Sequence, residues 1–493
     1  MKIPSIYEPE YSFLKNNSLL FFIFLLGLFL RIYNLGTESI WFDEAVSVAA
    51  SKLGFLEQIR WSLASSDNNP PLYYAFLRVW VLLFGDSEFA VRLPSAIFGS
   101  FSILLIYIVG ALLFNRKAAL LSALILAVSV FHIQFSQEGR AYSLAALLTL
   151  LSYYFFLKSA AERTGTNSLG YVISSALLIY AHYYGLFIIL SQNIFCAWQY
   201  STHRKSGAPD FKKWIALQVI LGIICIPGLY ILYRHSIGIQ NRFWLSPPTL
   251  KVLYDCFVLY SGSTYLLILL AVLSLPAVIS TRYFGGVFKP PARSPGEVGA
   301  SYSSSVFLLL LWLCVPVAVP FLISLVSTPI FFYRYTIVGS LAFYVLASFG
   351  AVRTGDKRFI PLVTGLVLIF SSVNIFGYYE RVDKPAWRAG INYIESNAGA
   401  GDVIVLYPWY ETEAAVYYAE RDDLTIISLA DEFYSAPDTG DNEFWLVLCD
   451  RWLDDVGNTK GTVERRIGES YDVLDTKEFP YLYIYRLKRK KNE

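Results

Sequence analysis

The sequence predicts an all-α protein that crosses a membrane many times and ends in a small α/β domain. Three observations predict this class. Only 16% of the 493 residues are charged, and the mean hydropathy is +0.47, whereas soluble domains contain about 25% charged residues. Eleven apolar stretches approach or reach the length that a helix needs to cross a bilayer. After about residue 380 the composition changes to that of a water-soluble domain.

The predicted spans follow one another from the N-terminal region to residue 378. The stretch 72–84 is also apolar, but it is short and begins after Pro70-Pro71. It therefore predicts a helix lying at the membrane surface. The expected spans are 18–35, 93–114, 118–136, 141–157, 169–181, 185–200, 214–233, 264–281, 305–326, 336–352 and 359–378.

Charged residues predict the orientation of these spans. Lys and Arg gather in alternate connections, such as Arg116-Lys117, and basic connections face the cytoplasm. The other connections collect acidic residues, such as Asp86 and Glu88. With the N-terminus inside and an odd number of spans, the C-terminal domain is expected outside. We expect the protein in the plasma (inner) membrane.

The residues after about 380 are expected to fold as a compact α/β domain of about 110 residues, large enough to hold its own core. The expected elements are strands at 402–407, 443–449 and 482–487 and a helix at 411–420. The predicted domains are therefore 1–379, with an outer loop at 36–92 that carries interfacial helices, and 380–493.

Composition also excludes some functions. The net charge is +2 and the last basic run, Lys488 to Lys491, is typical of a solvated tail, so no nucleic-acid partner is expected. The five cysteines contain no CxxC pair and no metal-ligand spacing, which argues against a metal cluster or a disulfide framework.

Ionisable and aromatic residues gather at the expected outer ends of the spans. Ionisable groups at membrane depth are costly and are therefore candidates for function. We expect them to meet in one cavity that faces away from the cytosol. In a second interpretation each is an ordinary anchor at the membrane surface, and this is favoured for His182 or Tyr184 taken alone. The residues are Asp43, Glu44, Glu138, Arg140, His182, Tyr183, Tyr184, Arg334 and Tyr335.

Such a set of side chains suits the transfer of a sugar from a phosphate-linked lipid. A carboxylate near Asp43 can take the proton from an acceptor hydroxyl. Arg140 and Arg334 can stabilise the leaving phosphate because a guanidinium binds phosphate oxygens in a bidentate manner. A divalent cation held by carboxylates could do the same. Glu138 stands two residues before Arg140 and is expected to hold it in place, and Tyr142 shares a helix face with Glu138.

Several sequence blocks, taken with their order and spacing, carry a resemblance to a known family. The blocks are Arg31–Gly36 with Trp41–Ala45, Asn69–Tyr74 with Phe84–Ser95, Phe135–Tyr142 and, more loosely, Arg334-Tyr335 and Lys384–Arg388. They resemble the lipid-phosphate-sugar-dependent glycosyltransferases with the GT-C fold, namely the family 39 protein mannosyltransferases, the aminoarabinose transferases and their prokaryotic relatives. The resemblance covers most of residues 25–200 well.

This resemblance implies an inverting transferase that uses a polyprenyl-phosphate sugar and a lipid, protein or polysaccharide acceptor. It implies Asp43 as the catalytic carboxylate with Glu44 in support, and either residue as the ligand if a cation is bound. Relatives carry His where Asn69 stands, which weakens the case for a metal. The implied phosphate-binding residues are Arg140, Arg334, Glu138, Tyr142 and Tyr335. The implied acceptor or sugar pocket contains Asn69, His182, Tyr183 and Tyr184.

Two other classes of function stay open. The chain could be a transporter or flippase of a lipid-linked sugar, but it contains neither obvious repeats nor a mid-span acidic residue. It could also be an inactive scaffold for a glycosylation system. The intact pairs Asp43-Glu44 and Glu138/Arg140 argue against a scaffold.

Overall fold

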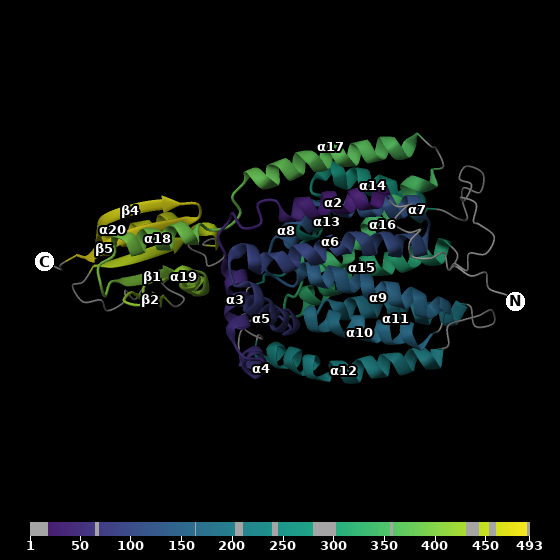
Figure 1. The fold of residues 1–493 in the computed structure, drawn as a ribbon, viewed down its shortest axis with the longest axis horizontal. Coiled ribbons are helices and arrows are strands. Elements are labelled where there is room, and N and C mark those ends of the chain that lie inside the picture. Colours follow the sequence, from purple (N-terminus) through teal and green to yellow (C-terminus); the bar gives the residue numbers. More distant parts are fainter. Residues whose placement is uncertain are drawn as a thin grey trace. The chain divides into compact units, whose positions relative to one another are not determined.

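Apolar helices make up most of the chain, and a small sheet lies near its C-terminus (Figure 1). This computed structural model describes residues 18–64, 69–162, 164–202, 211–238, 245–279, 302–354, 358–429, 443–452 and 460–490. The chain divides into two compact units. Unit 1 consists of Met1–Tyr33, Phe55–Phe76 and Arg92–Tyr378, and unit 2 of Asn34–Gly54, Leu77–Val91 and Tyr379–Glu493. The predicted fold class is confirmed.

Unit 1 is a bundle of helices, and each predicted span falls on a helix or on a bent pair of helices. Helix α5 (Leu72–Phe84) and helix α6 (Glu88–Leu113) belong partly to unit 1 and partly to unit 2. The other described elements of unit 1 are α2 (Ser18–Ile32), α4 (Phe55–Ala64), α7 (Arg116–Ala127), α8 (Val130–Ser136), α9 (Tyr142–Glu162), α10 (Gly165–Ala181), α11 (Gly185–Thr202), α12 (Phe211–Gly238), α13 (Leu250–Ser261), α14 (Thr264–Val278), α15 (Tyr302–Val326), η1 (Tyr333–Thr336), α16 (Ile337–Arg353) and α17 (Phe359–Glu380).

The number of eleven spans is not confirmed. Within the described residues, six helical segments are long and apolar enough to cross a membrane, and eight if each of two bent pairs counts as one span. Helix α2 has 15 residues and α10 has 17, fewer than the ~20 that a typical span needs. The apolar stretch at 72–84 is the helix α5 of 13 residues, and its place at the membrane surface remains a prediction.

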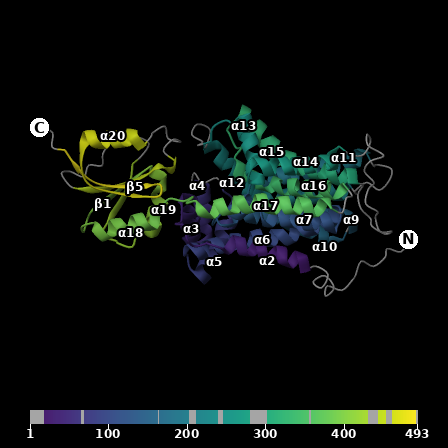
Figure 2. The same cartoon turned by 90° about the horizontal axis from the view of Figure 1, so that it is seen from above.

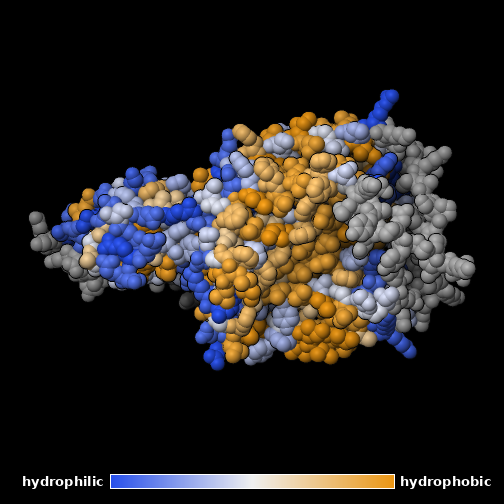
Figure 3. All heavy atoms as spheres, viewed as in Figure 1, coloured by the Kyte–Doolittle hydropathy of each residue, from blue (hydrophilic) through white to orange (hydrophobic). Residues whose placement is uncertain are grey.

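Helix α16 lies inside the bundle, because all 17 of its residues are buried. It packs against α7, α14 and α15 (Figures 1 and 2). By contrast, only 22% of the apolar window of α12 and 17% of that of α17 is buried. Apolar side chains cover much of the visible face of the helical bundle (Figure 3). Exposed apolar surface of this extent suits lipid hydrocarbon as the surrounding solvent.

The sequence does not predict the bend of 58° between α7 and α8. The last carbonyls of a helix have no partner inside that helix. Here the fully buried Arg31 supplies one, since its guanidinium donates to the carbonyls of Leu126 (3.0 Å) and Ala127 (3.1 Å). A cation also interacts favourably with the C-terminal end of a helix dipole. Arg31 therefore stabilises the end of α7.

The second bent pair, α13 and α14, turns by 87° at Gly262. Gly262 has a φ of +88°, in the left-handed region that glycine adopts without a steric penalty. The next residue, Ser263, caps α14 by accepting a hydrogen bond from the backbone N–H of Leu266. A glycine followed by a capping serine therefore explains this sharp turn.

Unit 2 combines residues 34–54 and 77–91 with the C-terminal residues. It contains α3 (Phe42–Lys52), α18 (Trp387–Asn397), η2 (Trp409–Glu411), α19 (Thr412–Tyr418), η3 (Asp450–Trp452), α20 (Lys460–Ser470) and five strands, β1 (Val403–Tyr407), β2 (Thr425–Ser428), β3 (Phe444–Cys449), β4 (Tyr471–Phe479) and β5 (Leu482–Arg489). The strand order is β2-β1-β3-β5-β4. Strand β1 is parallel to β2 and β3, whereas β5 is antiparallel to β3 and β4.

The predicted strands at 402–407, 443–449 and 482–487 are confirmed as β1, β3 and β5, and the predicted helix as η2 and α19. The sequence did not indicate β2 and β4. Strand β4 is an edge strand whose residues are mostly exposed, so it lacks the alternation that marks a half-buried strand. The division into domains at residue 379/380 stays a prediction. Unit 2 also includes 34–54 and 77–91.

Candidate active site

Residues of two of the sequence blocks, 69–74 with 84–95 and 135–142, meet at Arg140 in unit 1. Its side chain is buried, and Nη1 donates to the hydroxyl of Tyr74 on α5 at 3.3 Å. The backbone carbonyl of Arg140 accepts a hydrogen bond from Ser95 on α6 at 3.1 Å. The Ser95 hydroxyl also lies 3.1 Å from the hydroxyl of Tyr73. The block 69–74, the residues after Phe84 and the block 135–142 thus build one polar centre.

Gln137 anchors the loop that carries Arg140. Its Nε2 donates to the carbonyls of Arg31 (3.2 Å) and Tyr33 (2.7 Å), and its Oε1 accepts from the hydroxyl of Tyr378 (2.8 Å). Gln137 was part of a predicted block, but nothing in the sequence indicated this anchoring role. The contacts fix the end of α8 and therefore the position from which Arg140 projects.

Four of the predicted site residues form an aromatic cluster in unit 1. The ring centroid of His182 lies 5.2 Å from that of Tyr335, 5.9 Å from that of Tyr142 and 5.6 Å from that of Tyr184. These rings come from the start of α9, from the link between α10 and α11, and from η1. Residues that are up to about 190 positions apart in the sequence therefore lie side by side, and their role in a site stays a prediction.

Arg334 lies beside this cluster. It is buried, and its guanidinium lies 4.6 Å from the ring centroid of Phe332. The ring of Phe332 in turn lies 5.6 Å from that of Tyr335. The hydroxyl of Tyr184 donates to the carbonyl of Ile330 at 2.7 Å, which ties the α10–α11 link to the segment before η1. Both predicted phosphate-binding arginines are thus held in unit 1 by aromatic neighbours.

The remaining predicted residues of unit 1 lie in its connecting segments. Glu138 is buried in the loop before α9, Asn69 stands just before α5, and Tyr183 lies between α10 and α11. Their proposed roles stay predictions.

Asp43 and Glu44 belong to unit 2, in the first turn of α3. Asp43 is half-buried, whereas Glu44 is 0% exposed. The Oε2 atom of Glu44 accepts from Nζ of Lys384 at 3.2 Å. A carboxylate at the N-terminus of a helix also interacts favourably with the helix dipole. The predicted meeting of Asp43 with Arg140 and Arg334 stays a prediction.

Unit 2 contains a carboxyl group that the sequence did not single out. Glu411 is buried, its Oε2 accepts from Nε1 of Trp387 at 3.2 Å, and its Oε1 has no hydrogen-bond partner among the described residues. Burial raises the pKa of Glu411 to about 7, and the charge of Asp43 adds to this rise. Next to it, the ring of Tyr410 packs 5.6 Å from that of Phe42. Glu411 therefore belongs to the surroundings of Asp43.

No group of three or more His, Cys, Asp or Glu side chains among the described residues is arranged to hold a metal ion. Glu44, one of the two predicted ligands, already pairs with the ammonium of Lys384. A second cation at the same carboxylate would be repelled by that charge.

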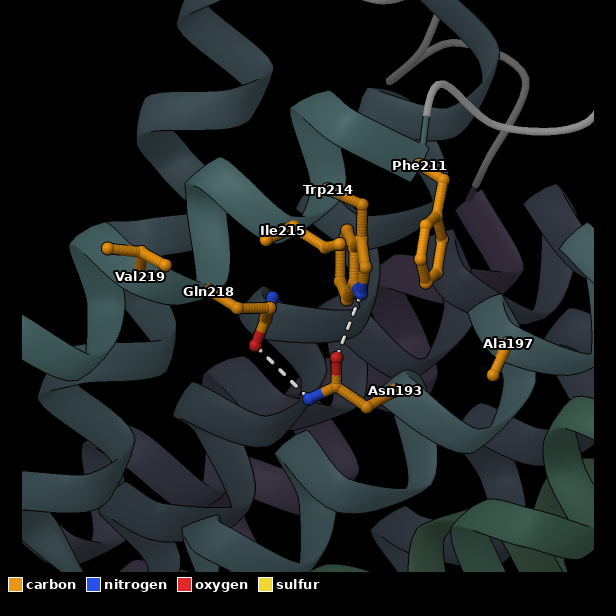
Figure 4. Close-up of a pocket in the computed structure, with 7 residues that line it drawn as sticks. All are labelled: Asn193, Ala197, Phe211, Trp214, Ile215, Gln218 and Val219. Carbon is orange, nitrogen blue, oxygen red and sulfur yellow. Dashed lines mark hydrogen bonds between the residues drawn. The ribbon is translucent and has the colours of Figure 1, made fainter.

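A cavity of about 440 Å³ lies elsewhere in unit 1, between α11 and α12 (Figure 4). Its lining is mostly apolar, and Nδ2 of Asn193 donates to Gln218 at 3.1 Å while Oδ1 accepts from Trp214 at 2.8 Å. None of the predicted site residues lines it.

The comparisons with known proteins agree with this architecture. Residues 68–238 match the model of the family described as dolichyl-phosphate-mannose-protein mannosyltransferase. ArnT from Cupriavidus metallidurans in the apo state has a TM-score of 0.60 and 12% identity, covering 96% of this chain and 98% of ArnT. The structure of ArnT bound to undecaprenyl phosphate has a TM-score of 0.59 and 12% identity, and the match covers 94% of this chain and 97% of ArnT. This chain has the GT-C fold. The resemblance inferred from the sequence blocks is confirmed.

A second GT-C structure, the oligosaccharyltransferase of Archaeoglobus fulgidus in complex with Zn and sulfate, has a TM-score of 0.52 and 13% identity. The match covers 83% of this chain but 62% of the archaeal one, less than two thirds of its length. The search of curated proteins finds no match. The GT-C fold and the apolar helices together make this protein a multi-pass membrane protein. The family match includes Tyr74, Arg140 and His182, whereas Asp43 and Arg334 lie outside it.

Proposed function

We propose that the protein transfers a sugar from a polyprenyl-phosphate-linked donor to an acceptor hydroxyl on the extracytoplasmic face, with inversion at the anomeric carbon. The observation that carries this proposal is that unit 1 of a GT-C fold contains both the buried Arg140, bonded to Tyr74, and the aromatic cluster of Tyr142, His182 and Tyr335. A similar structure, ArnT, has been solved with undecaprenyl phosphate bound. A buried guanidinium beside aromatic rings suits a ligand that carries both a phosphate and an apolar chain.

Arg140 and Arg334 bind the donor phosphate in this proposal. Both side chains are buried, so their charges are weakly screened and a bound phosphate gains more from them than it would in water. Tyr142 and Tyr335 line the same cluster, 6.4 Å apart between ring centroids. Glu138 adds a carboxylate that holds Arg140. The leaving phosphate departs without a general acid because these cations stabilise its charge.

Asp43 is the catalytic base, and Glu44 supports it. As the acceptor oxygen attacks the anomeric carbon, its proton passes to the Asp43 carboxylate. The bond between the anomeric carbon and the phosphate oxygen breaks on the opposite face of the sugar, and its electron pair leaves with the polyprenyl phosphate. Asn69, His182, Tyr183 and Tyr184 form the pocket for the sugar or the acceptor.

Reconstitution of the full-length protein in liposomes tests this function. The donor is undecaprenyl phosphate carrying radiolabelled mannose, the sugar in the name of the matching family, and other sugars follow in a panel. An envelope extract of the source cells supplies lipid, protein and polysaccharide acceptors. Labelled products together with free undecaprenyl phosphate support the transferase. Movement of intact donor across the bilayer would indicate a flippase, and neither result would indicate a scaffold.

A further inference from the structure

Lys384 forms a buried ion pair with Glu44, the residue next to the proposed base. The Lys384 side chain is 9% exposed and that of Glu44 is 0% exposed. A buried carboxylate without a compensating charge is strongly destabilising, and the ammonium of Lys384, 3.2 Å from Oε2 of Glu44, supplies positive charge. The two residues lie 340 positions apart. The positive charge of Lys384, at the start of the C-terminal segment, therefore neutralises the negative charge of Glu44 in the first turn of α3.

The same two segments are joined by backbone contacts. The Glu38 carboxylate accepts from the backbone N–H groups of Asp383 (2.6 Å) and Lys384 (3.3 Å). The hydroxyl of Ser39 accepts from the backbone N–H of Arg388 at 3.2 Å. The side chains of Glu38 and Ser39, which precede α3, are thus held by backbone N–H groups of residues 383–388.

A third contact comes from α19. The hydroxyl of Tyr418 accepts from the backbone N–H of Ile40 at 2.6 Å and donates to Glu88 at 2.8 Å. Glu88 also accepts from Nε of Arg388 at 2.8 Å. Helix α19 packs along α3. Within unit 2, the segment that leads into Asp43 is held on several sides by residues from the C-terminal part of the chain.

Neighbouring positions on a helix point about 100° apart, so Asp43 and Glu44 do not face the same way. A partner that anchors Glu44 therefore sets the rotation of α3 and with it the direction of the Asp43 carboxylate, without touching Asp43 itself. Small errors in the direction of a base are costly, since a misplacement of about 1 Å reduces a rate by about 100-fold.

We propose that Lys384 is a positioning residue for sugar transfer, which acts by pairing with Glu44 and fixing the orientation of Asp43. The inference rests on the proposed function. It also assigns the C-terminal segment a role in the reaction, because that segment completes the surroundings of the proposed catalytic helix.

The test compares Lys384→Met, Glu44→Gln, the double variant and Lys384→Arg in liposomes with labelled undecaprenyl-phosphate mannose. Rates are expressed per undecaprenyl-phosphate binding site, so that unfolded protein does not lower them. We expect Lys384→Met to reduce kcat at least about tenfold with a donor KM within about twofold. The double variant should recover part of this loss because it also removes the buried negative charge that Lys384 compensates. Lys384→Arg, which keeps the charge, should also recover part of it.

The matched control is Lys52→Met, which removes the last lysine of α3 from an exposed ion pair with Asp86, a residue between α5 and α6. Its kcat should equal that of the wild type. Asp43→Asn in the same assay separates the two proposals. An inactive wild type or an active Asp43→Asn contradicts the proposed function. If Asp43→Asn is inactive while Lys384→Met keeps the wild-type kcat, the positioning role of Lys384 alone is wrong. It is also wrong if the fold-loss of kcat in the double variant equals the product of the losses in Lys384→Met and Glu44→Gln.

Discussion

Glu411 is a buried carboxyl group of unit 2 whose proton affinity depends on its surroundings. Only one of its oxygens has a hydrogen-bond partner among the described residues, and its pKa is raised to about 7 by burial. Below pH 4.5 the carboxyl is protonated in the folded and the unfolded state alike. As the pH rises toward 7, the unfolded state loses its proton first, so folding becomes less favourable by about 3 kcal/mol.

We expect Glu411→Gln to remove this part of the pH dependence. The melting temperature of the detergent-solubilised variant should fall less between pH 5 and pH 7.5 than that of the wild type. Glu413→Gln is the matched control, because Glu413 is an exposed carboxylate two residues further on, in α19, and it should behave as the wild type. An identical pH dependence in Glu411→Gln and the wild type would contradict a raised pKa.

Some of the candidate residues taken from local sequence blocks lie close together in the structure. Arg140, Tyr142, His182 and Tyr335 were predicted from their types and their places at the ends of apolar stretches, and the structure brings the three aromatic residues together. Lys384 and Glu411 could not be assigned in this way. Their partners lie hundreds of positions away or in another element, and neither spacing nor periodicity carries information about such pairs.

At the level of elements, the helices were predicted but their bends were not. An apolar run has the same composition whether the helix within it is straight or broken, so periodicity cannot locate the bend of 58° after Ala127. The residue that stabilises this bend, Arg31, comes from a different helix. The turn at Gly262-Ser263 has a local signal, because glycine and a capping serine are typical of helix ends.

We expect Arg31→Met to destabilise the α7–α8 bend. The variant leaves two carbonyls of α7 without their donor in a buried site, which should cost about 2–3 kcal/mol. Thermal unfolding in detergent measures this loss. Arg381→Met serves as the control, because the Arg381 side chain is 54% exposed and pairs with Asp383 at the surface. A melting temperature equal to that of the wild type for Arg31→Met would contradict the capping role.

At the scale of the whole molecule, the distribution of Lys and Arg predicts an extracytoplasmic C-terminus. Alkaline phosphatase fused after Glu493 should be active in a bacterial host, since it folds only outside the cytoplasm, and a green fluorescent protein at the same site should be dark. The same reporters fused after Arg116, in an expected inner connection, should give the opposite result. A fluorescent C-terminal fusion with inactive phosphatase would reverse the orientation.

The central claim is that this GT-C protein transfers sugar with Asp43 as the base, and the transfer activity of Asp43→Asn tests it most directly. Asparagine keeps the size of the side chain but cannot accept the proton of the acceptor hydroxyl at neutral pH. With labelled undecaprenyl-phosphate mannose and envelope acceptors in liposomes, we predict that the wild type forms labelled product. The variant should bind undecaprenyl phosphate normally and form no product above background. Product formation by Asp43→Asn at the wild-type rate would contradict the account.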